Sequence, residues 1–155
     1  MGWVTLSLRK QTLQAEINEL NFQDIQLSRS IRAVHRHLAY ETSIFESEKS
    51  AQLKDAKAEY NKAKAGRPKV SDTEAYEEWK VDYEEAKEKY LEDKELIEDY
   101  YDDIKTELEE EAKNKEDEYN DEKTEVETQR DAMNAELQAI TDEIKSEIES
   151  SAIKF

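Results

Sequence analysis

Carboxylates are the most abundant side chains in this sequence that could do chemistry. The 155 residues include 40 Asp and Glu against 23 Lys and Arg. Two carboxylates can act as acid and base when burial separates their pKa values. The densest groups instead lie among other charged residues, where solvent surrounds them; they are Asp99, Asp102, Asp103, Glu109, Glu110 and Glu111. We therefore predict no catalytic residue in this acidic segment.

Glycine, histidine and cysteine usage argues against other enzyme and metal sites. Gly occurs only at positions 2 and 66, which excludes Gly-rich phosphate loops and calcium loops with a central Gly. His35 and His37 are two residues apart, so on a helix they point to different sides and cannot form a two-histidine metal site. There is no Cys to supply a thiolate. The sequence predicts a protein that is not an enzyme and that binds no metal and no cofactor.

Two further groups of side chains have a binding chemistry to consider. Arg29, Arg32 and Arg36 form a basic stripe at helical spacing that could meet phosphate groups, but the formal net charge of -17 opposes nucleic acid as a partner. Tyrosines recur every seven residues, which is the spacing of a coiled-coil seam and not of a ligand-stacking platform; they are Tyr76, Tyr83 and Tyr90. We expect no small-molecule substrate.

The elements that position these residues are predicted to be long helices. Charged residues make up 41% of the chain and the mean hydropathy is -1.07, so a thin apolar seam can form but a large globular core cannot. Good helix formers dominate the composition. No apolar stretch reaches the roughly 20 residues that a membrane span needs, so no membrane partner is expected.

One boundary interrupts the helical pattern. Gly66 stands where a helix often ends on a left-handed residue, and Pro68 follows. Ser71 and Glu74 have the spacing of a capping box that starts a new helix. The predicted segments are a docking segment at 1–8, a first coiled-coil helix at 9–65, a turn at 66–71, an acidic second helix at 72–125 and a C-terminal oligomerisation or partner-binding helix at 126–155. Whether residues 109–130 bend into a third helix stays open.

Two apolar seams predict the fold class. Both alternate steps of three and four residues, the coiled-coil pattern. The first contains Leu13, Ile17, Leu20, Asp24, Leu27, Ile31, Val34 and Leu38, and the second contains Tyr76, Trp79, Tyr83, Ala86, Tyr90, Asp93, Ile97, Tyr100 and Ile104. Because the connection is short, the helices should be antiparallel neighbours. We predict an all-α protein, a long antiparallel helical hairpin or coiled coil with an extended acidic second helix.

The alignment of the two helices follows if the chain reverses at Pro68. Facing residue numbers then sum to about 136, which places Tyr60 opposite Tyr76 and Phe45 opposite Tyr90. The same alignment lays Arg29, Arg32 and Arg36 beside Asp99, Asp102, Asp103 and Glu107. It also brings Leu6 opposite Arg130, so the last 25 or so residues should lack a partner within the hairpin.

The two chain ends are therefore the predicted contact sites. Residues 3–8 alternate polar and apolar like a strand that could add to a partner's sheet, or they begin a helix at Thr5 or Ser7 with Trp3 as a staple. The predicted partner-binding residues are Trp3, Val4, Leu6, Leu8, Met133, Leu137, Ile140, Ile144, Ile148, Ile153 and Phe155. The expected partner is a larger protein assembly, a second copy of the chain, or both.

The chain ends also carry a resemblance. Residues 1–10, followed by a heptad helix, and residues 134–155 resemble small coiled-coil structural proteins of tailed bacteriophages. The resemblance implies a virion or assembly component, bound in symmetric copies to larger shell, portal or tail proteins. It implies a location in the virion; without it, the expected location is cytoplasmic.

Two other hypotheses remain open at this point. A coiled-coil chaperone or export adaptor would grip a client at the hairpin tip, through Arg67, Lys69 and Val70. An acidic mimic of nucleic acid would bind basic proteins through residues 92–125, and that binding would collapse with salt.

Overall fold

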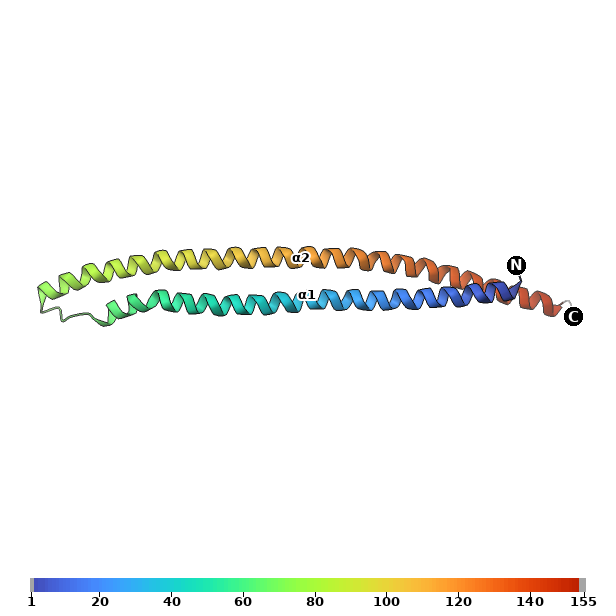
Figure 1. Ribbon diagram of the computed structural model, residues 1–155, viewed down its shortest axis with the longest axis horizontal. Coiled ribbons are helices and arrows are strands. Elements are labelled where there is room, and N and C mark those ends of the chain that lie inside the picture. Colours follow the sequence, from blue (N-terminus) through green and yellow to red (C-terminus); the bar gives the residue numbers. More distant parts are fainter. Residues whose placement is uncertain (1, 154–155) are drawn as a thin grey trace. The chain divides into compact units, whose positions relative to one another are not determined.

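The structure, a computed structural model, describes residues 2–153, and for Ile153 it describes the backbone only. Helix α1 runs from Trp3 to Ala65 and helix α2 from Thr73 to Ile153 (Figure 1). The predicted all-α helical hairpin is confirmed. Because α2 continues without interruption through residues 109–130, that segment does not start a third helix.

Helix α1 begins at Trp3, so the strand interpretation of residues 3–8 is wrong. The carbonyl of Gly2 accepts hydrogen bonds from the amides of Thr5 and Leu6, at 3.1 and 3.3 Å, which closes the first turn. Leu6 lies seven residues before Leu13, and both side chains are buried. Helical backbone over residues 3–8 is what brings these two leucines onto one seam.

The turn differs from its predicted chemistry. Gly66 does not have a positive φ, and its amide donates to the carbonyl of Lys62 at 3.1 Å, which continues the hydrogen-bond pattern of α1. The cap of α2 is Asp72, whose Oδ1 lies 3.4 Å from the amide of Ala75. The predicted left-handed Gly66 and the predicted Ser71 cap are therefore both wrong. Asp72, one residue after Ser71, takes the cap position, because its carboxylate accepts a hydrogen bond from a free backbone amide and is stabilised by the positive end of the helix dipole.

Gly66→Ala is expected to preserve or raise stability. An added Cβ would lie 3.5 Å from the carbonyl oxygen of Lys62 and 3.6 Å from that of Ala63, which are ordinary contacts. Ala restricts the unfolded chain more than Gly, a gain of about 0.4 to 1 kcal/mol where the backbone is compatible. Urea denaturation followed by circular dichroism measures the change. A clear loss of stability would show that position 66 needs the conformational freedom of Gly.

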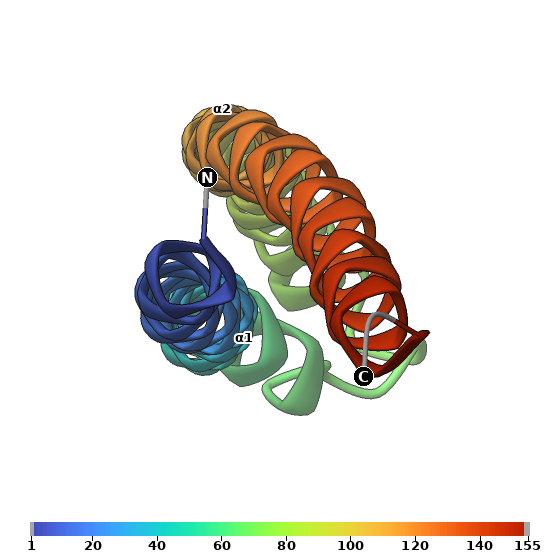
Figure 2. The ribbon, with the colours of Figure 1, turned by 90° about the vertical axis from the view of Figure 1, so that its right-hand side faces the viewer.

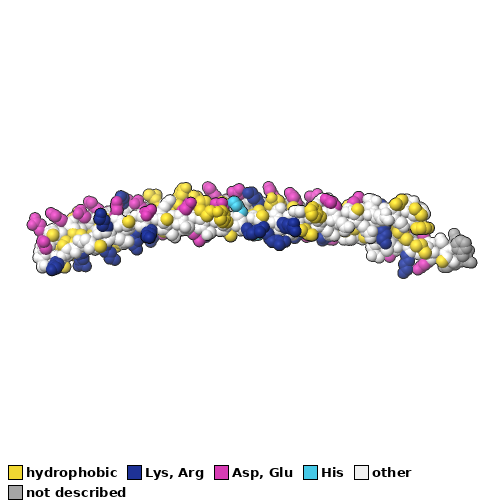
Figure 3. Space-filling model, turned by 60° about the horizontal axis from the view of Figure 1, so that its bottom comes forward, with side chains coloured by type: hydrophobic (Ala, Val, Ile, Leu, Met, Phe, Trp, Pro, Cys, Tyr) yellow, Lys and Arg dark blue, Asp and Glu magenta, His cyan; other side chains and the backbone are white. Residues whose placement is uncertain are grey.

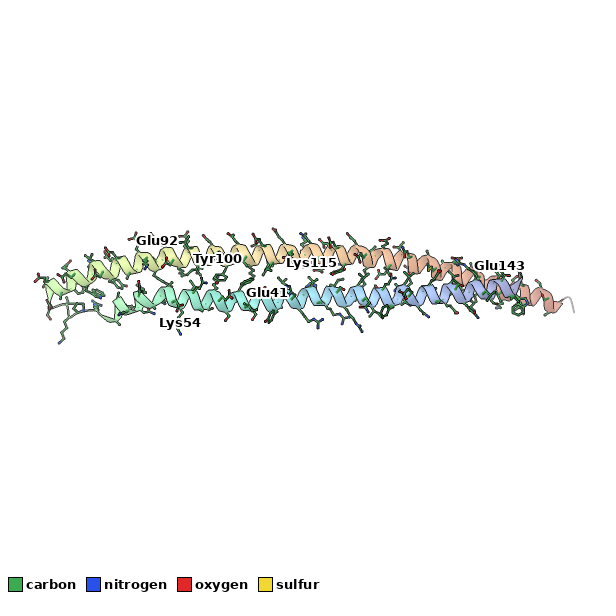
Figure 4. The ribbon with its side chains drawn as sticks, viewed as in Figure 1. Glu41, Lys54, Glu92, Tyr100, Lys115 and Glu143 are labelled. Carbon is green, nitrogen blue, oxygen red and sulfur yellow. The ribbon has the colours of Figure 1, made fainter. Side chains whose placement is uncertain are left out.

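The hairpin divides into two compact units, each with a segment of α1 beside a segment of α2 (Figure 1, Figure 2). The first unit contains residues up to His35 and from Lys113 onward, and the second contains Arg36–Ala112. The core of the first unit is formed by Leu6, Leu13 and Ile140, with Met133, Leu137 and Ile144 packed against it. In the second unit the buried side chain is Tyr101, beside Phe45. Charged side chains such as Lys54 and Glu92 point outward (Figure 4).

The predicted alignment of the helices is wrong by about three turns. Contacting residues in both units have numbers that sum to between 142 and 154, not to 136. Phe45 packs against Tyr101 instead of Tyr90, and Asp102 pairs with Lys49 instead of an arginine of the basic stripe. The physical reason is found at the tip of the hairpin, where the last turn of α1 does not face the first turn of α2. The last turn of α1 lies against Trp79, six residues into α2, because the Trp79 indole N–H donates to the carbonyl of Ala63 at 2.6 Å.

Candidate partner-binding surface

The structure separates the predicted partner-binding residues into two groups. Leu6 and Ile140 are buried, and Met133, Leu137 and Ile144 pack against them, so these five belong to the hairpin's own core. The expectation that the C-terminal seam lacks a partner within the chain is therefore wrong as far as Ile144. By contrast, more than half of each side chain is exposed at Trp3, Val4, Leu8 and Ile148. The side chain of Ile153 and all of Phe155 lie outside the described residues.

A second apolar stripe continues from Val4 and Leu8 along the side of α1 that faces away from α2. We call it the outer stripe; it consists of Val4, Leu8, Gln11, Ala15, Asn18, Phe22 and Ile25, which follow one another at steps of four and three. All seven side chains are exposed, and Phe22 and Ile25 are 55% and 50% exposed. Such steps are the pattern by which one helix packs on another.

The outer stripe contains no charged residue, in a chain of which 41% is charged. The charged side chains among residues 3–26 lie elsewhere on α1. Arg9 pairs with Glu136 at 3.0 Å, and Asp24 lies 3.4 Å from Arg130, so both face α2. Figure 3 shows hydrophobic side chains gathered toward the end of the molecule where α1 begins. An uncharged face that repeats at heptad spacing is unusual for a helix surface that meets only water.

Exposed apolar residues of the second unit do not form such a stripe. They are Tyr40, Val70, Val81, Leu91, Leu96 and Tyr100, and those on α2 stand among acidic and basic neighbours. Single exposed apolar residues are normal on protein surfaces. The outer stripe of the first unit is therefore the stronger candidate for a binding surface.

The aromatic side chains near the tip stack on one another within the seam of the second unit. Tyr60 stacks on Tyr90 with ring centroids 5.4 Å apart, and Trp79 stacks on Tyr83 at 4.9 Å. The hydroxyls of Tyr60 and Tyr83 are 3.1 Å apart, and this hydrogen bond lowers the pKa of Tyr60 and raises that of Tyr83. Packing in the seam, as predicted, occupies these rings. Arg67 covers the cluster, with its guanidinium 5.7 and 5.8 Å from the rings of Tyr76 and Trp79.

A polar layer crosses the seam of the first unit. Asp24 Oδ2 lies 3.4 Å from a guanidinium nitrogen of Arg130, and the Lys123 ammonium lies 4.0 Å from Asp24 Oδ1. Lys123 also donates to Ser28 Oγ at 3.0 Å, and Arg130 to Asn21 Oδ1 at 3.4 Å. Asp24 Oδ1 is buried without a hydrogen bond. Because its side chains are used in contacts with one another, this layer is part of the hairpin and not a binding site.

No protein-family model, curated protein or solved structure matches this sequence. Over residues 2–153, no three His, Asp or Glu side chains come together as metal ligands. In the same part of the chain neither helix is long and apolar enough to cross a membrane.

Titration of Tyr101 predicts a loss of stability at alkaline pH. Its side chain is only 5% exposed, and burial raises its pKa above 10.0, with Glu48 and Tyr100 adding to the effect. The folded state therefore holds the neutral phenol more tightly than the unfolded chain does. Its contribution is complete below about pH 10 and declines as the pH rises through the raised pKa. Tyr101→Phe should flatten this alkaline decline, measured as the urea midpoint from about pH 8 to 11.5.

Tyr40→Phe is the matched control, because Tyr40 is 65% exposed. An alkaline decline of equal slope in wild type and Tyr101→Phe would contradict the assignment to Tyr101.

Proposed function

We propose that this chain is a non-catalytic structural or assembly component of a larger protein complex, which acts through helix packing and through docking of its ends. The observation that carries the proposal is the group of exposed apolar side chains at the start of α1, Trp3, Val4 and Leu8. All three lie within three residues of the buried Leu6 on the same helix, so their backbone is held by the core while their side chains face solvent. Preorganised apolar anchors of this kind lower the entropic cost of binding.

Near the other chain end, Ile148 on α2 contributes to the proposed docking surface. It lies one turn beyond Ile144, which packs on the core, yet Ile148 itself is half exposed. Trp and Ile side chains buried in a partner's pocket would each supply about 1.5 to 3 kcal/mol of transfer free energy. Docking through residues near both chain ends, which belong to the same unit, would then fix the orientation of the hairpin on its partner.

The finer proposal is that the complex is the virion of a tailed bacteriophage. It is supported by the resemblance of residues 1–10 and 134–155 to phage coiled-coil proteins and by the acidic composition, with a net charge of -17 that discourages unspecific contact with nucleic acid. Purified particles from the source would then contain the chain at a fixed copy number, measured by quantitative mass spectrometry.

Site-specific photo-crosslinking in the producing cell tests the docking role. A photoreactive residue at Trp3 or Ile148 should crosslink to one larger protein in constant yield, whereas the same residue at Leu96, which is 67% exposed, should not. Equal labelling from all three positions, or no product other than the chain itself, would contradict an assembly role carried by this end.

The alternative is a coiled-coil chaperone or export adaptor that grips a client at the hairpin tip. Val70, which is 66% exposed, favours it. Crosslinks to a client from Val70 and not from Trp3 or Ile148 would support the adaptor and count against the structural role.

A further inference from the structure

The residue types of the outer stripe of α1 are arranged symmetrically about its centre. Its two outer pairs are apolar, Val4 with Leu8 and Phe22 with Ile25; inside them stand the two amides Gln11 and Asn18; at the centre stands Ala15. A two-fold contact between identical helices brings residue i of one copy to residue j of the other and j to i. The stripe has the symmetry that such a contact requires when the helices run antiparallel.

We infer that a second copy of this chain covers the outer stripe, as an antiparallel two-fold dimer centred on Ala15. Val4 and Leu8 of one copy then pack on Phe22 and Ile25 of the other, and each Gln11 amide reaches an Asn18 amide. The small side chain of Ala15 at the axis lets the backbones approach closely. The stripe extends over 22 residues, or about 33 Å of helix. The inference goes beyond the proposed function, because the second copy covers Val4 and Leu8 and leaves Trp3 and Ile148 for a larger partner.

Charge supports a second copy as the occupant. In this alignment Lys10 comes level with Glu19 and Leu20 of the other copy, so opposite charges face each other there and no like charges oppose one another. Arg29, the next position after Ile25 in the pattern, falls beyond Trp3 of the other copy and bounds the contact.

The position of α2 supports the same arrangement. Residues 113–153 carry 13 Asp and Glu against 5 Lys and Arg, and two such segments would repel each other at a shared interface. Within the first unit, α2 packs on the seam of α1, opposite the outer stripe. A contact through the two outer stripes therefore keeps the acidic segments of the two copies apart.

The first measurement is the mass in solution over a range of concentrations, by light scattering with sedimentation velocity. The wild-type chain should reach twice 18.2 kDa. The double variant Leu8→Glu with Phe22→Glu should weaken dimerisation by at least about tenfold, because each dimer would bury four carboxylates. Leu91→Glu with Leu96→Glu, at side chains 51% and 67% exposed, is the control and should leave the dimer intact. A wild-type chain that stays a helical monomer at all concentrations would overturn the inference.

Disulfide trapping tests the orientation without depending on the charged variants. The chain has no Cys, so a single introduced thiol can only bridge two copies. Ala15→Cys should oxidise to a covalent dimer, and a mixture of Leu8→Cys with Phe22→Cys should form the mixed disulfide far more than either homodimer. A mixture that gives mainly the 8–8 and 22–22 products would mean a parallel dimer. A dimer that none of these thiols traps would mean another interface. Either result overturns the inference.

Discussion

Replacing Leu13 by Ala should destabilise the first unit by about 2 to 5 kcal/mol. Leu13 is the largest fully buried side chain, with 0% exposure, and it joins Leu6 on α1 to Ile140 on α2. The seam between two helices is thin, so few neighbours can move to fill the space. Because whole domains are stable by only about 5 to 15 kcal/mol, a large part of the stability would be lost. Thermal and urea unfolding followed by circular dichroism measures the effect.

The control for this prediction is Leu96→Ala. Leu96 is 67% exposed and lies outside both the core and the outer stripe, so its truncation should change the free energy of unfolding by less than about 0.5 kcal/mol. Equal effects of the two substitutions would mean that Leu13 is not buried as the structure shows.

Replacing Arg130 by Leu should cost about 1 to 3 kcal/mol. The substitution leaves the Asp24 carboxylate with Lys123 as its remaining cation, at 4.0 Å, while one carboxylate oxygen is buried without a hydrogen bond. Losing one partner of a fully buried pair costs about 3 to 5 kcal/mol. The Arg130 and Asp24 side chains keep 26% and 21% exposure, so solvent reduces the effect.

The double variant Asp24→Leu with Arg130→Leu separates the pair from its desolvation. Replacing both charges with apolar side chains should return stability to within about 1 kcal/mol of wild type or above it. The same urea titration at one buffer and salt concentration compares all three proteins. If Arg130→Leu alone left the free energy of unfolding unchanged, the fold would not depend on the pairing of Asp24 with Arg130.

The fold could be predicted because its signals are local and repeated. Heptad spacing from Leu13 to Leu38 and from Tyr76 to Ile104 marks two helices, and the Gly66–Pro68 segment marks the turn between them. The alignment could not be predicted, because a stripe that repeats every seven residues still pairs apolar with apolar after a shift. In the second unit the offset includes the contact of Trp79 with Ala63, which no periodicity in the sequence reveals.

The candidate surface was predictable only in part. Val4 and Leu8 were identified from their place at the chain end, whereas Phe22 and Ile25 were missed although they continue the same pattern. Gln11 and Asn18 interrupt that pattern with amides, and the more apolar seam of Leu13, Ile17 and Leu20 dominates the same segment. The expectation that residues 133–144 lack a partner within the hairpin was wrong because it depended on the predicted alignment of the helices.

The polar layer at Asp24 favours one register, that is one relative alignment, of the two helices of the first unit. Seam residues of α2 recur at Glu116, Lys123, Arg130 and Leu137, each seven apart. In the observed register the Asp24 carboxylate lies between two cations, Lys123 and Arg130. Sliding by one heptad would place it either between Arg130 and Leu137 or between Glu116 and Lys123. Only one of these three registers gives the carboxylate two cations. This single aspartate therefore distinguishes between registers that heptad spacing alone would leave equally favourable.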